Sequence, residues 1–279
     1  MEALSYEFMQ RSVIATTLVC AVAPLVGAFV VQRRQALIGD GVGHVAFAGV
    51  GLAFVTGYNP FVGALLLTLV AAYALFRMER RGRLGGDLAL AMVFYGGIAL
   101  GYLFTQRAGG GLNSVVGFLF GSPNNLTWGQ VWAIAALCLA VLVVILALYG
   151  PLVSIAFDEP AARVSGVPTD ALQLVLTVVV ALIVVGGMYA LGILLVAGMM
   201  VIPVAASSQL ARSYRGTMLG GSLVGVACAL TGSLGAFYAD VPTGSAIVLL
   251  AVVAYLAAAV LRAARQRYAV GSSRRAATV

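Results

Sequence analysis

Long apolar runs separated by short polar breaks dominate this chain. Nine runs reach or approach the length of about 20 apolar residues that a helix needs to cross a bilayer. They cover residues 12–32, 36–57, 60–76, 88–105, 126–149, 171–187, 189–210, 216–238 and 243–261. The third and sixth runs are short, so eight spans plus one re-entrant segment is the alternative. The pattern predicts an all-α fold, a polytopic integral membrane bundle of transmembrane helices.

The composition excludes a soluble protein. Hydrophobic residues make up 62% of the chain and charged residues 9%, whereas a soluble domain carries about 25% charged residues. Cys20, Cys138 and Cys228 each stand alone in an apolar run, so we expect buried, unpaired side chains rather than disulfides or metal ligands. We expect residues 1–279 to form a single transmembrane domain.

The arginines indicate how the chain is oriented. All 16 basic residues are Arg. With nine spans and the N-terminus outside, 14 of them fall on one side and only Arg11 and Arg107 on the other. The positive-inside rule then predicts an external N-terminus and a cytoplasmic C-terminus. This topology explains the net charge of +7 without a nucleic-acid partner, and the basic tail at 262–279 suits anionic membrane lipid.

The second apolar run begins with an ionisable pair. Asp40 and His44, the only histidine in the chain, are four residues apart and therefore share one face of a helix. Counting from Arg34, Asp40 would lie about 9 Å deep in the membrane and His44 about 15 Å. Such a pair usually lines an ion or substrate path. A carboxylate oxygen and an imidazole nitrogen together suit Zn²⁺ or Mn²⁺, and a twofold dimer would supply two of each.

Two simpler interpretations of this pair stay open. Asp40 could act as the N-cap of the second helix. His44 could be a core histidine that is hydrogen-bonded to a backbone carbonyl. The membrane setting favours the functional interpretation, because burial of polar groups is penalised there.

The connection at residues 154–168 carries the signals of a short helix on the Arg-rich, cytoplasmic side. Asp158 can cap the helix, Pro160 suits its first turn, and Gly166 followed by Pro168 would end it. Such a helix can dock into a groove on a cytoplasmic partner. An ordinary interfacial connection is the alternative.

Two further positions interrupt the later apolar runs. Pro203 is expected to break or kink its helix, which would expose backbone carbonyls. Asp240 is expected at the outer end of its span, where a carboxylate can stay hydrated, and it could equally be a turn residue.

Four segments in order resemble the membrane permease subunit of zinc, manganese and iron ABC importers. The matching patterns are RRxxLxGDxxxHxxxxG at Arg33–Gly49, SFDxxxARxxGxP at Ser154–Pro168 with Ile155 and Ala156 inserted, LLVxxxxVIPxAA at Leu194–Ala206, and YxDxPxG at Tyr238–Gly244. The similarity covers nearly the whole chain, which makes it far more specific than any one motif.

The resemblance implies a permease of the bacterial inner membrane that pairs with a second permease copy. Its partners would be a cytoplasmic ABC ATPase subunit and an extracytoplasmic metal-binding protein. Asp40 and His44 match the metal path of the family. The coupling segment to the ATPase would include Phe157, Asp158, Ala161, Ala162, Arg163 and Gly166. The chain lacks Lys and therefore a GxxxxGK[ST] phosphate loop, so a partner would hydrolyse ATP. The metal is cargo, and no cofactor is expected to stay bound.

The resemblance also implies alternating access. A divalent ion would arrive near residues 106–125 and Asp240, pass to Asp40 and His44, and be released as the coupling segment transmits the movement of the ATPase. The choice among zinc, manganese and iron stays open. The alternatives are a secondary metal transporter, a permease for chelated iron or haem, and a purely structural subunit. No segment in the second half matches the Asp40 and His44 segment, which argues against a pseudo-symmetric secondary transporter.

Overall fold

Helices make up nearly all of the structure. A computed structural model describes residues 5–80, 86–109, 117, 119–121 and 126–276, with side chains described as far as residue 266. The helices are α1 (Glu7–Gln32), α2 (Ile38–Thr56), α3 (Pro60–Arg80), α4 (Gly86–Arg107), α6 (Trp128–Ala147), α7 (Tyr149–Phe157), α8 (Glu159–Val164), α9 (Thr169–Met188), α10 (Ile193–Ser208), α11 (Tyr214–Ala239) and α12 (Thr243–Ala276).

Eight of these helices are long and apolar enough to cross a membrane, which confirms the predicted all-α polytopic bundle. Among the described residues, eight such helices and one shorter apolar helix agree with the alternative count of eight spans, but the short helix does not come from the third or sixth run, as the sequence suggested. Helix α3 has 21 residues and α9 has 20, because each extends past its apolar run into polar residues. The shorter apolar helix is α10, with 16 residues. The apolar run at 189–210 gives a shorter helix because the chain turns at Gly192 before α10 begins. The φ of Gly192 is 93°, which lies in the left-handed region.

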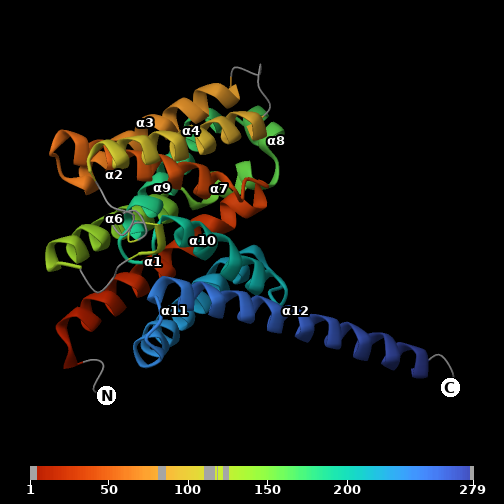
Figure 1. Ribbon diagram of the computed structural model, residues 1–279. Helices are drawn as coiled ribbons and strands as arrows, with labels where there is room; N and C mark the ends of the chain where they lie inside the picture. The colour runs from red at the N-terminus through yellow and green to blue at the C-terminus, as the bar shows by residue number, and fades with distance from the viewer. Residues whose placement is uncertain (1–4, 81–85, 110–116, 118, 122–125, 277–279) are drawn as a thin grey trace.

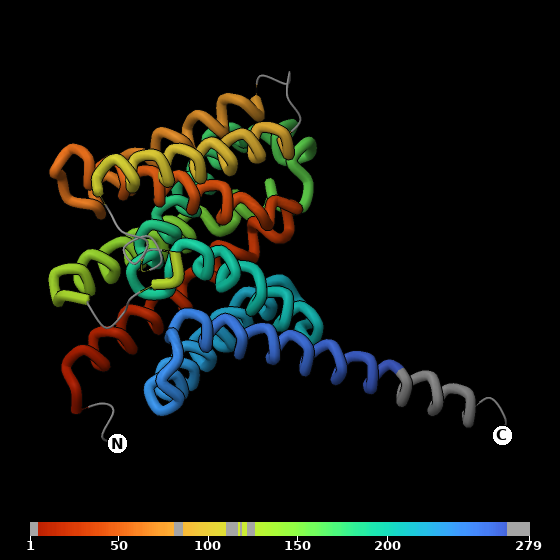
Figure 2. The backbone as a smooth tube through the Cα atoms, viewed as in Figure 1, coloured from red at the N-terminus to blue at the C-terminus, as the bar shows by residue number. Residues whose placement is uncertain are grey.

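The helices form a bundle in which α1, α2 and α9 are the most enclosed. Buried residues make up 78% of the most apolar stretch of α2, but 22% of those of α3 and α4. Helix α2 packs against α3 and α4, whereas α1, α10 and α12 pack against α11. Figure 1 shows α2, α3 and α4 side by side at the top of the view, with α11 and α12 at the bottom. Helix α12 extends beyond the bundle toward the C-terminus (Figure 2).

The structure tests three local predictions, which concern the cysteines, the fifth apolar run and Pro203. The three cysteines are buried and free, as expected. The fifth apolar run does not form one helix, because α6 ends and α7 begins at Leu148. Helix α7 ends at Phe157. Helix α10 continues through Pro203 rather than breaking there.

Polar contacts join the helix termini at the two ends of the bundle. At one end, the Arg11 guanidinium donates to the Leu126 carbonyl at 3.1 Å, and the Trp128 indole donates to Glu7 at 2.7 Å. At the other end, Arg33 at the end of α1 is bonded to Glu159 of α8. The α7–α9 connection therefore lies beside the start of α2, which carries the predicted metal residues.

Candidate functional site

Asp40 and His44 lie in the first two turns of α2. The helix begins at Ile38 and its N-cap is Leu37, which makes no side-chain capping bond. The interpretation of Asp40 as the N-cap is therefore wrong. Asp40 is half-buried, and only 8% of His44 is exposed. One helical turn separates the two residues, so they face the same neighbours.

Both side chains line one open pocket between α2 and α4. The pocket has a volume of about 410 Å³. Its walls include Asp87, Phe94 and Tyr95 of α4, together with Leu194 of α10. The predicted pair is thus brought together at a cavity large enough for a hydrated ion.

The imidazole of His44 has no hydrogen-bond partner among the described residues. The Phe94 ring packs edge-on against it, with the ring centroids 4.5 Å apart. The expected bond of a core histidine to a backbone carbonyl is therefore not found in this part of the chain. Since His44 lines the open pocket, its ring nitrogens are available to something that enters the pocket.

A glycine on α4 allows this close packing. A Cβ atom at Gly97 would lie 2.8 Å from both the carbonyl carbon of His44 and the backbone nitrogen of Val45. Real Cβ atoms do not approach so closely, so only glycine permits α4 to contact α2 at this level. The Gly97/Gly101 pair is an instance of the small-xxx-small spacing that lets membrane helices approach.

The pocket contains a carboxylate that the sequence reasoning missed. Asp87 lies in the first turn of α4 and lines the same cavity. The apolar run was counted from residue 88, which left Asp87 out. The sequence does contain a pattern that could have identified Asp87. Like Asp40, it stands at the start of a span that follows an Arg-rich connection. Within the described ranges, no three His, Cys, Asp or Glu residues are close enough to hold a metal ion.

The α7–α9 connection has the local structure that its capping signals predict. The Asp158 carboxylate accepts a hydrogen bond of 2.9 Å from the Ala161 backbone N–H and so caps the six-residue helix α8. Gly166, with φ of 82°, ends the turn. Ala162 is buried against the bundle, whereas Ala161 is exposed on the outer surface. The role of these residues in coupling stays a prediction.

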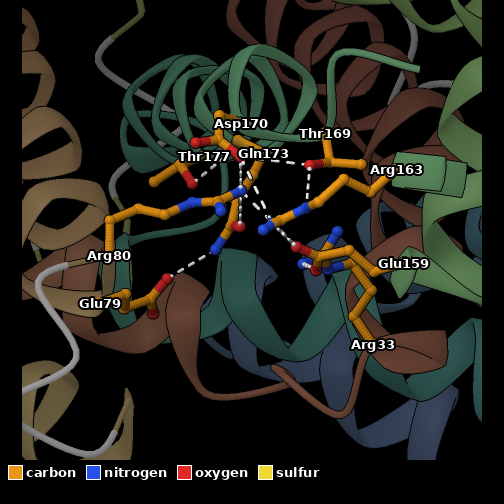
Figure 3. A network of polar contacts seen from close by, with 9 residues as sticks. All are labelled: Arg33, Glu79, Arg80, Glu159, Arg163, Thr169, Asp170, Gln173 and Thr177. Carbon is orange, nitrogen blue, oxygen red and sulfur yellow. Dashed lines mark hydrogen bonds and ion pairs between the residues drawn. The ribbon is translucent and has the colours of Figure 1, made fainter. Parts of the chain in front are cut away.

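Side chains just before α8 and near its end contact other helices. Phe157 packs edge-on against Tyr214 of α11, with a centroid distance of 5.3 Å. Arg163 donates to Thr169 at the start of α9, at 3.2 Å, and to Glu159 at 3.1 Å. Figure 3 shows a network in which Glu159 and Asp170 are surrounded by arginines from three elements. The sequence analysis assigned Arg163 to the coupling segment, but it did not predict that arginines from other elements would pair with Glu159 and Asp170.

Asp240 lies apart from the pocket. It follows α11 as the C-cap residue, with φ of 51° and ψ of 46° in the left-handed region. This conformation fits the turn interpretation, since Asp tolerates it better than most residues. The side chain is exposed. The other predicted access segment, residues 106–125, falls mostly outside the described residues.

Known proteins resemble this chain over most of its length. It is 31% identical to an uncharacterized membrane protein of Synechocystis sp., covering 91% of each chain. It is 29% identical to the manganese transport system membrane protein MntC of Halalkalibacterium halodurans, covering 89% of this chain and 85% of the relative. The solved structure of PsaBC from Streptococcus pneumoniae in complex with Fab superposes with a TM-score of 0.83 and 26% identity, covering 91% of this chain and 92% of that one. The model of the ABC 3 transport family matches residues 5–262, so the chain belongs to that family.

Proposed function

We propose that the chain is the permease subunit of an ATP-driven importer of a divalent transition metal, manganese or zinc. The observation that carries the proposal is the His44 imidazole, which has no hydrogen-bond partner within the described ranges and lines a pocket together with the Asp40 carboxylate. The MntC relative is a membrane protein of a manganese transport system, which supports the same cargo.

The donor chemistry of the pocket fits such an ion. Carboxylate oxygen and imidazole nitrogen are ligands that both Mn²⁺ and Zn²⁺ accept. One Asp40 and one His44 give too few ligands for either ion. A second copy of the chain, related by a twofold axis, would supply the other half of the shell. The ion is bound as cargo and released.

The proposed complex also contains an ATPase subunit and a binding protein. The full sequence contains no phosphate-binding loop, so ATP hydrolysis belongs to a cytoplasmic ATPase that docks on α8. An extracytoplasmic binding protein delivers the ion to the opposite face, near Asp240. This arrangement places the N-terminus outside, the C-terminus in the cytoplasm, and the complex in the bacterial inner membrane.

Metal uptake by variants of the pocket tests this function. Cells deprived of metal would express the complete importer with the wild-type chain, His44→Ala or Asp40→Asn, at matched membrane levels. We expect uptake of one metal to fall at least about tenfold in each variant, because each removes a proposed metal ligand and even the loss of a residue that only orients a ligand costs about 10–100-fold in metal affinity or activity. Tyr95→Phe is the matched control, since it removes a polar atom from the same pocket but no proposed ligand.

The outcomes separate the alternatives. Uptake that persists in both pocket variants would make His44 and Asp40 structural. A wild-type chain that moves neither metal would contradict the importer itself. Uptake that continues after the ATPase subunit is deleted would indicate a secondary transporter, and competition by haem or chelated iron rather than free metal would indicate a larger cargo.

A further inference from the structure

Helix α8 has little apolar contact to hold it against the bundle. It has six residues, of which only Ala162 is buried. Val164 is 91% exposed. A helix this short has little stability of its own. Its position relative to the membrane helices therefore depends on side chains that reach from α8 to other elements.

Arg163 connects α8 to the start of α9, and Glu159 connects α8 to the ends of α1 and α3. The Oε2 atom of Glu159 accepts a hydrogen bond from Arg33 Nη2 at 2.9 Å. Its Oε1 atom lies 3.1 Å from Arg163 Nη2 and 3.5 Å from Arg80 Nη2. One carboxylate thus joins α8 to the end of α1 and to the end of α3, as Figure 3 shows.

Arg33 depends on this contact more than the other arginines do. Its side chain is 10% exposed, compared with 22% for Arg80 and 55% for Arg163. Arg80 also pairs with Asp170 and donates to Gln173 at 3.3 Å. Among the described residues, Glu159 is the one carboxylate that pairs with Arg33. An enclosed guanidinium without its partner is strongly unfavourable.

Of the three arginines that contact Glu159, Arg33 and Arg80 lie next to the helix that carries the proposed metal ligands. Arg33 is the C-cap of α1, and the chain turns at Arg34, with φ of 58°, before α2 begins at Ile38. Arg80 is the last residue of α3, which packs along α2. A displacement of α8 that pulls on Glu159 therefore acts on the start of α2 from two sides.

We propose that Glu159 is a positioning residue that transmits the movement of α8 to the α1–α2 junction through Arg33 and to α3 through Arg80. This inference rests on the proposed function, in which the ATPase moves α8 and α2 carries the metal ligands. Glu159 is not among the residues that line the pocket of Asp40 and His44. Its loss should uncouple the two activities of the complex rather than abolish either site.

The test measures metal uptake and ATP hydrolysis separately in the reconstituted importer. The purified complex, with its ATPase and binding protein, would be placed in lipid vesicles with the wild-type chain or Glu159→Gln. We expect ATP hydrolysis to stay close to wild type and metal moved per ATP to fall about tenfold, a usual size for a lost coupling contact. Asp170→Asn is the matched control, because it makes the same charge change in the same network but leaves the Arg33 contact intact.

Two further variants distinguish a loss of coupling from a folding defect. Arg33→Gln removes the other half of the contact and should lower metal moved per ATP by a similar factor. Arg33→Gln combined with Glu159→Gln leaves no unpaired charge, so it should assemble and should be no worse than either single variant. Defects that multiply in the double variant would overturn the inference, as would an equal defect in Asp170→Asn or unchanged coupling in Glu159→Gln. A wild-type complex that moves no metal would instead contradict the proposed function.

Discussion

At the scale of single residues, Gly97 controls how α4 meets the backbone of His44. Gly97→Ala would place a methyl group 2.8 Å from the His44 carbonyl carbon. We expect the helices to separate, at a cost of about 1–3 kcal/mol for overpacking, and metal uptake to fall as His44 shifts. Thermal unfolding in detergent and cellular uptake would measure the two effects.

The neighbouring glycine supplies the control for this prediction. A Cβ atom at Gly96 would meet nothing within 4 Å, so Gly96→Ala should preserve stability and uptake. Because Ala also favours the helix by about 1 kcal/mol over Gly, the control can even raise the unfolding temperature. Equal losses in the two variants would contradict the close contact at Gly97.

At the scale of elements, α8 depends on the cap at Asp158. Asp158→Ala removes the acceptor for the Ala161 N–H, and loss of an N-cap costs about 0.5–2 kcal/mol. We expect faster hydrogen exchange of the backbone amides at Glu159 and at residues 161–164, and weaker co-purification of the ATPase. Asp158→Ser keeps an acceptor without the charge and should restore both. A serine variant as defective as the alanine variant would show that the charge, and not the cap, matters.

The sequence predicts the elements better than it predicts their contacts. Apolar length alone locates the spanning helices, because the bilayer requires about 20 residues per crossing. It underestimates α3, since the helix continues through Arg77 to Arg80 beyond the apolar run. The pair at Asp40 and His44 could be placed on one face from their spacing. No local pattern could pair Glu159 with Arg33, because the two are 126 residues apart in the chain.

At the scale of the whole molecule, the predicted helices do not by themselves determine which surfaces meet. The α2–α4 contact depends on glycine positions that are common throughout this chain, which has 34 glycines. The sequence therefore favours close packing without choosing the partner helix. Asp87 shows the consequence, because it becomes part of the pocket only when α4 lies beside α2. One chain still provides an incomplete set of the proposed metal ligands.

Completion of that set by a second copy predicts how mixed complexes behave. We expect cells that make equal amounts of the wild-type chain and His44→Ala, at a constant total, to retain about one quarter of the uptake of wild type alone. Random pairing leaves about one quarter of twofold dimers with both imidazoles, and a dimer with one imidazole lacks a ligand. Uptake measured against a series of mixing ratios should follow the square of the wild-type fraction. A linear dependence, with about half of the uptake at equal amounts, would show that each copy acts alone or pairs with a different permease.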